Sequence, residues 1–241
     1  EKYLNAISTS GINFVELGFR SQKKDNYFGP LAYCTENFIS KLKIPDSVQL
    51  GVMINASEIR ESKNFQEIMN NLFPVKASNS KVSLVRIATS LEDIEYAIKA
   101  GEWLKNQKYI IGLNLMQIAT LSFDEIKNFA SKFKIFKPDV IFFADSTGTL
   151  KAENIDTIIK GLRTSWIGDI GIHAHDNMHR ALINTLEAHK KGVKWLDSTV
   201  NGLGRGPGNT KTEDIVFELR GINEKNIDFL PLIDLIQNEF S

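Results

Sequence analysis

"DIGIHAHDNMHRALINTLEAHKKGVKWLDSTV", residues 169–200, contains two apolar runs separated by a stretch with helical spacing. The runs 169–175 and 194–200 have the length and the apolar content of buried strands. Between them, apolar residues of 181–192 recur on one side of a helix, and Gly192 suits the C-terminus of that helix. This stretch therefore predicts a strand–helix–strand unit whose strands run parallel.

The same alternation extends along the rest of the chain. The repeat is roughly 25–35 residues long, the size of one such unit. No linker or low-complexity segment interrupts it, so we expect a single domain over 1–241, of the α/β class and the (β/α)8 TIM-barrel type. Further strands are predicted at 12–18, 48–55, 81–88, 108–116 and 139–145, and further helices at 91–107, 122–133 and 153–162.

The pattern gives one strand too few for a closed barrel, because seven are predicted where eight are needed. The segment 1–11 has a helical pattern, although a barrel should begin with a strand. We therefore expect strand 1 to lie upstream of Glu1, which makes this chain an N-terminally truncated barrel. An open Rossmann-type sheet is the alternative, but no Gly-x-Gly-x-x-Gly motif follows an early strand.

Composition excludes several classes of function. The chain has 29 basic and 29 acidic residues, which gives no electrostatic footprint for nucleic acid or an anionic membrane. No apolar run approaches the roughly 20 residues of a membrane span. The single cysteine, Cys34, excludes an internal disulfide and suits a reducing compartment, so we expect a cytoplasmic protein. No His or Lys flanks Cys34, so we expect a packing or surface thiol rather than a nucleophile.

Polar residues occur near the C-terminal ends of the predicted strands. In a barrel, alternate residues face the axis, and the C-terminal ends of the strands form the face that carries active sites. Burying so many polar groups is costly unless they satisfy one another or a ligand. The residues are Glu16, Asn55, Arg86, Asn114, Asp145, His173, His175 and Asp197.

Some of these residues also have a purely structural interpretation. A lone interior histidine is usually a hydrogen-bonded core residue, and only the spacing of two of them argues for a site. Glu16 and Arg86 could be a buried ion pair that braces the barrel, and Asp197 could cap the loop that follows it. His179 and His189 fall in the helical region after the histidine strand, and we expect both on the surface or on a helix face.

His173 and His175 are the basis of a predicted metal site. Their spacing turns both imidazoles to one side of a strand, which is half of a ligand set for Zn²⁺, Mn²⁺, Fe²⁺ or Co²⁺. Oxygen ligands would shift the preference toward Mn²⁺ or Mg²⁺. The loop "NGLGRGPGN" (201–209) could cradle a phosphate, but it lacks the ending of a P-loop. We favour a bent loop that places Asn209 beside the histidines.

The motifs "HAHDN" (173–177), "ADSTG" (144–148) and "NGLGRGPGN" resemble those of a superfamily of metal-dependent TIM-barrel lyases and synthases. This superfamily contains 4-hydroxy-2-oxovalerate aldolase, hydroxymethylglutaryl-CoA lyase, isopropylmalate synthase and homocitrate synthase. The likeness runs from "VELGF" (15–19) to "GNTKTED" (208–214) and is strongest to the aldolase branch.

The resemblance implies roles for individual residues. By likeness, His173, His175 and Asn209 hold a divalent cation, which is Mn, Co, Zn or Mg. The superfamily's Asp-x-Thr-Leu-Arg-Asp run of strand 1, which supplies a third ligand and an arginine, has no counterpart here. That absence agrees with the missing strand. The expected catalytic residues are Asp145, Glu16 and Arg86, and the expected substrate-binding residues are Ser146, Asn114 and Asn55.

The function implied is an aldehyde-lyase that cleaves or forms a C–C bond of a 4-hydroxy-2-oxo acid. The cation would act as a Lewis acid and stabilise the pyruvate enolate. A Claisen-type acyl-CoA lyase or synthase, or an inactive barrel that serves as a scaffold, are the alternatives. We expect a small-molecule 2-oxo acid substrate, a homodimer as one assembly, and no activity from a fragment that lacks strand 1.

Overall fold

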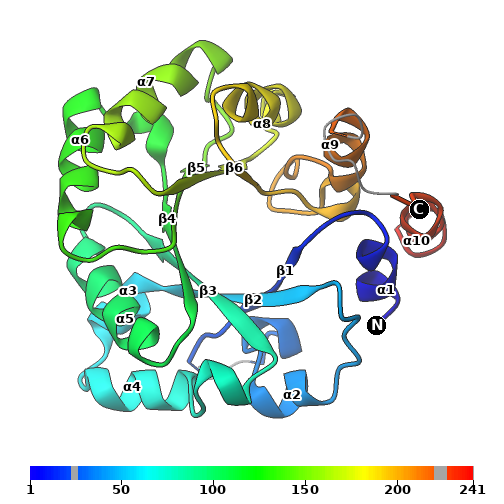
Figure 1. Cartoon of the computed structure of the whole chain (residues 1–241), viewed down its shortest axis with the longest axis horizontal. Coiled ribbons are helices and arrows are strands. Elements are labelled where there is room, and N and C mark those ends of the chain that lie inside the picture. Colours follow the sequence, from blue (N-terminus) through cyan, green and yellow to red (C-terminus); the bar gives the residue numbers. More distant parts are fainter. Residues whose placement is uncertain (23–26, 220–226, 241) are drawn as a thin grey trace. The chain divides into compact units, whose positions relative to one another are not determined.

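The computed structural model describes residues 1–22, 27–219 and 227–240 (Figure 1). Its internal contacts divide the chain into two compact units. Unit 1 consists of Glu1–Ser8 and Ile12–Asn114, and unit 2 consists of Thr9–Gly11 and Leu115–Ser241. The prediction of one domain over 1–241 stays a prediction.

Parallel strands alternate with helices, which confirms the predicted α/β class. Each predicted strand is present, with small shifts at its ends except for the last, which is much shorter, and the strands follow one another in chain order in the sheet. Within the described residues, no strand precedes β1, and the first element is a helix, as predicted. The strands are β1 (Phe14–Phe19), β2 (Gln49–Asn55), β3 (Val82–Thr89), β4 (Ile110–Leu115), β5 (Val140–Asp145), β6 (Asp169–Ala174) and β7 (Trp195–Leu196).

The predicted helices are also present, and several short ones join them. In unit 1 the helices are α1 (Lys2–Ser8), α2 (Glu36–Ser40), α3 (Ala56–Glu61), α4 (Phe65–Leu72) and α5 (Ile94–Asn106), with 3₁₀ turns η1 (Pro30–Ala32) and η2 (Ala77–Asn79). In unit 2 they are α6 (Phe123–Ser131), α7 (Ala152–Arg163), α8 (Ala181–Lys190), α9 (Thr212–Glu218) and α10 (Leu230–Glu239), with η3 (Ile118–Thr120), η4 (Lys132–Lys134) and η5 (Val200–Gly202). None of the described helices combines the length and the hydrophobicity of a membrane span.

In unit 1, strands β2 and β3 form the central pair. Their register aligns Met53 with Arg86 and Asn55 with Ala88. All but the ends of β2 is buried, and helices α3 and α5 pack on β3, as Figure 1 shows. A strand buried on both faces reads as a nearly continuous apolar run, which is why both segments could be recognised in the sequence.

A buried arginine cluster holds the segment after β1 in unit 1. The Arg20 side chain is 1% exposed, and its Nη2 atom lies 2.6 Å from Oε1 of Glu36. Its Nε and Nη1 atoms donate to the carbonyls of Cys34 and Leu72, and the guanidinium lies 4.9 Å from the ring centre of Phe73. Each of these contacts offsets part of the cost of burying the charge.

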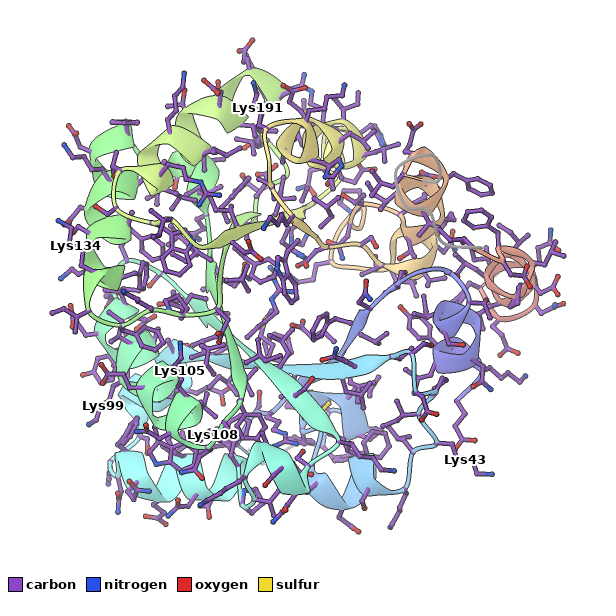
Figure 2. The ribbon with its side chains drawn as sticks, in the orientation of Figure 1. Lys43, Lys99, Lys105, Lys108, Lys134 and Lys191 are labelled. Atoms are coloured by element: carbon purple, nitrogen blue, oxygen red, sulfur yellow. The ribbon has the colours of Figure 1, made fainter. Side chains whose placement is uncertain are left out.

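In unit 2, strands β5 and β6 pair from Val140 with Asp169 to Asp145 with Ala174. Every residue of β5 is buried. Helices α6, α7 and α8 follow one another along this pair in Figure 1, and α8 packs on β6. Helix α6 begins with a capping box in which Ser122 and Glu125 bond each other's backbone amides. Lys134, labelled in Figure 2, lies at the outer edge of this helical layer.

Strand β7 is much shorter than the predicted strand 194–200. Only Trp195 and Leu196 pair with β6, and the chain then turns away into η5. Thr199 pairs instead with the segment after the glycine-rich loop, through its amide to the carbonyl of Thr210 and through an isolated bridge to Lys211. The ladder therefore ends early because the returning loop takes over the backbone hydrogen bonds.

Candidate functional site

Strand β6 carries both predicted histidine ligands at its carboxyl end. His173 lies within β6 and His175 just beyond it, so the alternation of the strand turns both rings to one side. The ring centres are 5.0 Å apart, with the ring planes at 81°. His175 is 8% exposed, and 24% of the His173 side chain is exposed. The two imidazoles therefore meet at a site that a small ligand can reach.

The ring of His173 is oriented by Asp197. The register of β6 with β7 pairs Ile172 with Leu196, and the Asp197 amide donates to the Ile172 carbonyl at 3.0 Å. The carboxylate Oδ2 of Asp197 lies 3.0 Å from Nδ1 of His173. Because an ionised carboxylate can only accept, Nδ1 is the donor in this contact, and in the neutral ring the lone pair is then at Nε2. This carboxylate–imidazole arrangement is the one that supports histidine ligands in metal sites.

The glycine-rich loop folds back onto the end of β6. Asn209 forms an antiparallel bridge with His175, and the Asp176 amide donates to the Gly208 carbonyl at 2.9 Å. The base of the loop is closed by the Asn209 amide, which donates to the Gly202 carbonyl at 3.0 Å. A Cβ on Gly208 would meet that same carbonyl, and the φ of Gly208 is +97°, so the sharp return needs glycine there. The predicted bent loop is what the structure contains.

The side chain of Asn209 has a fixed orientation and one unused acceptor. Its Nδ2 atom donates to the Leu203 carbonyl at 3.0 Å, which sets the amide, because the opposite orientation would bring two oxygens together. Its Oδ1 atom is buried and has no hydrogen-bond partner among the described residues. A buried amide oxygen without a partner is costly, so a ligand at this point would relieve that cost.

Asp145 organises the loop that follows β5. The residue is 0% exposed, and its oxygens accept from the amides of Thr149 at 3.2 Å and Leu150 at 3.0 Å. The hydroxyl of Thr147 is 3.4 Å from Oδ1. Next to it, the Ser146 hydroxyl oxygen accepts from the Gln117 amide at 3.0 Å. The carboxylate thus holds its own loop, and its contact with a substrate stays a prediction.

Asn177, in the loop after β6, is approached by the loops after β5 and β7 of unit 2. A Cβ on Gly148 would be 2.7 Å from Cβ of Asn177, so the loop after β5 approaches the loop after β6 very closely. The φ of Gly148 is +64°, which also favours glycine. On the other side, a Cβ on Gly206 would lie 3.8 Å from Oδ1 of Asn177. The loops after β5, β6 and β7 therefore converge within unit 2.

The remaining predicted site residues belong to unit 1. Arg86 of β3 and Glu16 of β1 form an ion pair, with Nη1 and Oε2 3.4 Å apart, and the Arg86 side chain is 6% exposed. Asn55 is the last residue of β2. Asn114 in β4 is 5% exposed, and its Oδ1 atom has no hydrogen-bond partner within the described ranges. Their roles in catalysis and substrate binding stay predictions.

The electrostatics of the histidine pair suit metal ligands. Burial lowers the pKa of His175, and the charges of His173 and Arg205 lower it further, while Asp145 opposes them. A lowered pKa favours the neutral imidazole, which is the form that binds a metal. No set of three His, Cys, Asp or Glu side chains that could hold a metal occurs in the described part of the chain. The role of His173, His175 and Asn209 as metal ligands stays a prediction.

A comparison with protein families places the chain in a known family. A family model described as HMGL-like matches residues 3–237. The chain belongs to the HMGL-like family. The predicted resemblance is therefore confirmed at the level of the family.

Curated relatives of this HMGL-like chain carry the name 4-hydroxy-2-oxovalerate aldolase. One from Rhodococcus opacus is 29% identical over 165 residues, which is 68% of this chain and 47% of the relative. One from Geobacillus thermodenitrificans is 31% identical over 166 residues, or 67% of this chain and 47% of the relative. The chain thus spans about half the length of the curated relatives that it matches.

Solved structures resemble the HMGL-like chain over nearly its whole length. The "N-terminal domain of a putative aldolase" from Bacteroides vulgatus is 27% identical with a TM-score of 0.87, and the match covers 98% of this chain and 77% of that one. Hydroxymethylglutaryl-CoA lyase from Pseudomonas aeruginosa is 16% identical with a TM-score of 0.75, over 98% and 83% of the two chains. These likenesses confirm the predicted fold class, an α/β fold of the TIM-barrel type.

The structure also indicates roles for residues outside the predicted catalytic, substrate-binding and metal-binding sets. Asp197 was open to interpretation as a loop cap, and Asn177 and Arg205 were not selected. The signal for Asp197 is the strand register, which the sequence does not specify. Asn177 stands two residues after His175 in the "HAHDN" motif, and Arg205 is the sole charged residue of the loop 201–209.

Proposed function

We propose that the natural protein is a divalent-metal-dependent aldolase that cleaves a 4-hydroxy-2-oxo acid to pyruvate and an aldehyde, or joins the two. One observation carries the proposal: the rings of His173 and His175 lie 5.0 Å apart, and Asn209, whose buried Oδ1 atom has no partner within the described ranges, is bridged to His175. The names of the curated relatives support the choice of reaction.

The residues present fit a divalent cation. Two neutral imidazoles and an amide oxygen form a mixed nitrogen and oxygen donor set, which suits Mn²⁺, Co²⁺, Zn²⁺ or Mg²⁺. His173, His175 and Asn209 would hold the cation, together with at least one further oxygen donor. When bound, such a cation supplies Lewis-acid stabilisation of the negative charge that develops on the substrate oxygen.

The bond changes of the proposed reaction are those of a retro-aldol cleavage. A base takes the proton of the 4-hydroxyl group, the C3–C4 bond breaks, and the aldehyde leaves. The bonding electrons pass to C3, which accepts a proton to give the methyl group of pyruvate. The reverse sequence makes the C–C bond, so no oxidant, reductant or other co-reactant is needed.

The residues of unit 2 orient the donors in this proposal. Asp197 keeps the proton of His173 at Nδ1, so that Nε2 is available. The Leu203 carbonyl accepts from Nδ2 of Asn209, and Oδ1 is left without a partner within the described ranges. Asp145 shapes the loop that presents Ser146, which we propose as a substrate-binding residue.

The residues of unit 1 complete the proposed assignment. We retain Glu16 and Arg86 as catalytic candidates, because the buried guanidinium of Arg86 is paired with the partly exposed carboxylate of Glu16. Asn114 and Asn55 are retained as substrate-binding candidates. For Asn114, the buried and unpartnered Oδ1 atom supports a role in contacting a ligand.

The second candidate is an acyl-CoA lyase or synthase. Solved structures named hydroxymethylglutaryl-CoA lyase resemble this chain at 14–18% identity, a level that supports the fold and leaves the substrate open. The curated relatives named as aldolases favour the first candidate. Incubation with acyl-CoA substrates, followed by detection of free coenzyme A, distinguishes the two.

The test combines metal content with product formation in the full-length protein. We expect close to one equivalent of bound metal by mass spectrometry, and pyruvate release from 4-hydroxy-2-oxopentanoate. The variant His173→Ala with His175→Ala should lose both. His189→Ala is the control, because His189 lies near the C-terminal end of α8 and contacts the Val193 carbonyl instead.

Three results would contradict the proposal in different ways. Free coenzyme A without pyruvate would favour the second candidate. Absence of bound metal, even after incubation with Mn²⁺, would leave the inactive scaffold. Equal metal loss in the His189→Ala control would show that the effect is unspecific.

The cellular location and the oligomeric state of the protein are also proposals. A cytoplasmic location fits the single free cysteine, which suits reducing conditions. A homodimer is the assembly that we expect, and sedimentation of the full-length protein would test it.

A further inference from the structure

Arg205 is a charged side chain in unit 2 whose function the fold does not explain. It is exposed, and its guanidinium has no ion pair or hydrogen bond within the described ranges of the chain. Only its backbone carbonyl is engaged, by the Gly208 amide at 3.2 Å. The other residues of 202–208 are Gly, Leu and Pro, so the loop presents a single charged group.

The anchoring of the loop keeps Arg205 close to the histidine pair. Asn209, four residues further along the chain, is bridged to His175, and Gly208 is bonded to Asp176. The neighbouring Gly206 lies against Asn177. Arg205 therefore stands at the rim of the donor site rather than at a remote surface.

The carboxylates around this site are already engaged by other groups. Asp145 accepts from the amides of its own loop, and Asp197 accepts from His173. Asp176 accepts from the amide of Ala181 at the start of α8. Each of these contacts is part of the local fold. The guanidinium of Arg205 therefore has no ion-pair partner among these three carboxylates.

We propose that Arg205 is a specificity-determining residue that binds an anionic group on the aldehyde half of the substrate. This inference rests on the proposed aldolase function, in which the cation site takes the oxygens of the 2-oxo acid half. A guanidinium binds carboxylates and phosphates through paired hydrogen bonds, and both groups share the chemistry that this residue would recognise. The substrate class is then a 4-hydroxy-2-oxo acid whose far end carries a negative charge.

The test uses two matched pairs of substrates on the full-length protein loaded with Mn²⁺. The first pair is 4-hydroxy-2-oxopentanoate, with an uncharged end, and 4-hydroxy-2-oxoglutarate, with a carboxylate end. The second pair is 2-oxo-3-deoxygluconate and its 6-phosphate. For each pair, the ratio of kcat/KM for the charged over the uncharged substrate is measured from pyruvate release.

The variants separate charge recognition from general damage. Arg205→Gln removes the charge, and Arg205→Lys keeps it without the paired donors. Lys134→Gln is the control, because Lys134 is an exposed cation of η4, ahead of β5, and so lies at the opposite end of the strands from the glycine-rich loop. Figure 2 shows Lys134 at the outer edge of the helical layer of unit 2.

We expect Arg205→Gln to lower the ratio by about ten- to hundredfold for the preferred pair, as loss of a charge-assisted hydrogen-bond pair does. Arg205→Lys should lower it less, and Lys134→Gln should leave it unchanged. The pair with the larger loss identifies carboxylate or phosphate as the preferred group.

Failure of this inference differs from failure of the proposed function. Cleavage of the uncharged substrates with an unaltered ratio in Arg205→Gln overturns the role of Arg205 and keeps the aldolase assignment. Equal losses for charged and uncharged substrates likewise overturn charge recognition. Absence of pyruvate from all four compounds overturns both proposals.

Discussion

Oδ2 of Asp197 lies 3.0 Å from Nδ1 of His173, and the two residues are 24 positions apart in the sequence. Their strands are neighbours, and the aligned pair Ile172 and Leu196 brings the side chains together. The contact fixes the tautomer and the direction of one imidazole before any ligand arrives. Its removal should therefore weaken metal binding without removing a ligand.

We predict that Asp197→Ala lowers the affinity of the full-length protein for Mn²⁺ by about 10- to 100-fold, the usual effect of losing such a partner. Isothermal titration calorimetry measures this affinity. Asp169→Ala is the matched control, because Asp169 begins β6 and contacts Trp195 and Lys194 at the other end of the strand. The same loss in both variants would contradict the orienting role of Asp197.

Asn209 and Asn184 allow a comparison of two buried amides. Each donates Nδ2 to a backbone carbonyl, at 3.0 Å and 2.9 Å, and each has a buried Oδ1 atom without a partner within the described ranges. We predict that Ala at either position lowers the free energy of unfolding by about 1–3 kcal/mol, because a buried carbonyl loses its donor. Only Asn209→Ala should also lower Mn²⁺ affinity by about tenfold or more.

Urea denaturation and metal titration of both variants check this prediction. The proposed role of Oδ1 as a ligand would be wrong if Asn184→Ala changed metal affinity as much as Asn209→Ala did.

Alanine substitutions at Gly148 and Gly192 distinguish the stability cost of a strained backbone from the cost of a steric clash. Both have positive φ, at +64° and +87°, but a Cβ on Gly148 would meet Asn177 at 2.7 Å, whereas nothing lies within 4 Å at Gly192. We predict that Gly192→Ala costs about 1–2 kcal/mol of stability, from the left-handed backbone alone. Gly148→Ala should cost about 1–3 kcal/mol more, because the two loops must separate.

Chemical denaturation of the two glycine variants gives both free energies. Equal costs would show that the loop after β5 can move away from Asn177 freely.

Cys34 should react slowly in the folded protein. It is 0% exposed, and burial raises the pKa of its thiol to about 11, although Arg20 opposes this effect. Because the thiolate is the reactive form and the thiol stays protonated until the pH approaches the raised pKa, alkylation near neutral pH should be about a hundredfold slower than for a free cysteine. Iodoacetamide labelling followed by mass spectrometry measures the rate, with the urea-unfolded protein as the reference. Rapid labelling of the native protein would contradict this account.

The sequence was sufficient to predict features that depend on local patterns. Strand β5 is apolar throughout, and helix α7 repeats apolar residues with helical spacing, so both could be recognised without any contact information. Short helices such as α2 and α3 were missed, since five or six residues carry too little periodicity, and their packing within unit 1 stabilises them.

The histidine pair was also accessible from the sequence, because alternation along a strand is a local rule. His173 and His175 had to share a side if 169–175 was a strand. The glycines of 201–209 likewise predicted a sharp turn. The reaction that we propose rests on the likeness of whole motifs to those of a family, because the spacing of single residues does not specify a reaction.

Only the tertiary structure decided how these parts meet within each unit. Strand register set Asp197 against His173, backbone bridges set Asn209 against His175, and burial of Arg20 tied together segments far apart in the chain. The sequence by itself determined the order of strands and helices and the residues that face one side of β6. Contacts between distant segments depend on register and close packing, which arise when the chain folds and which local patterns do not encode.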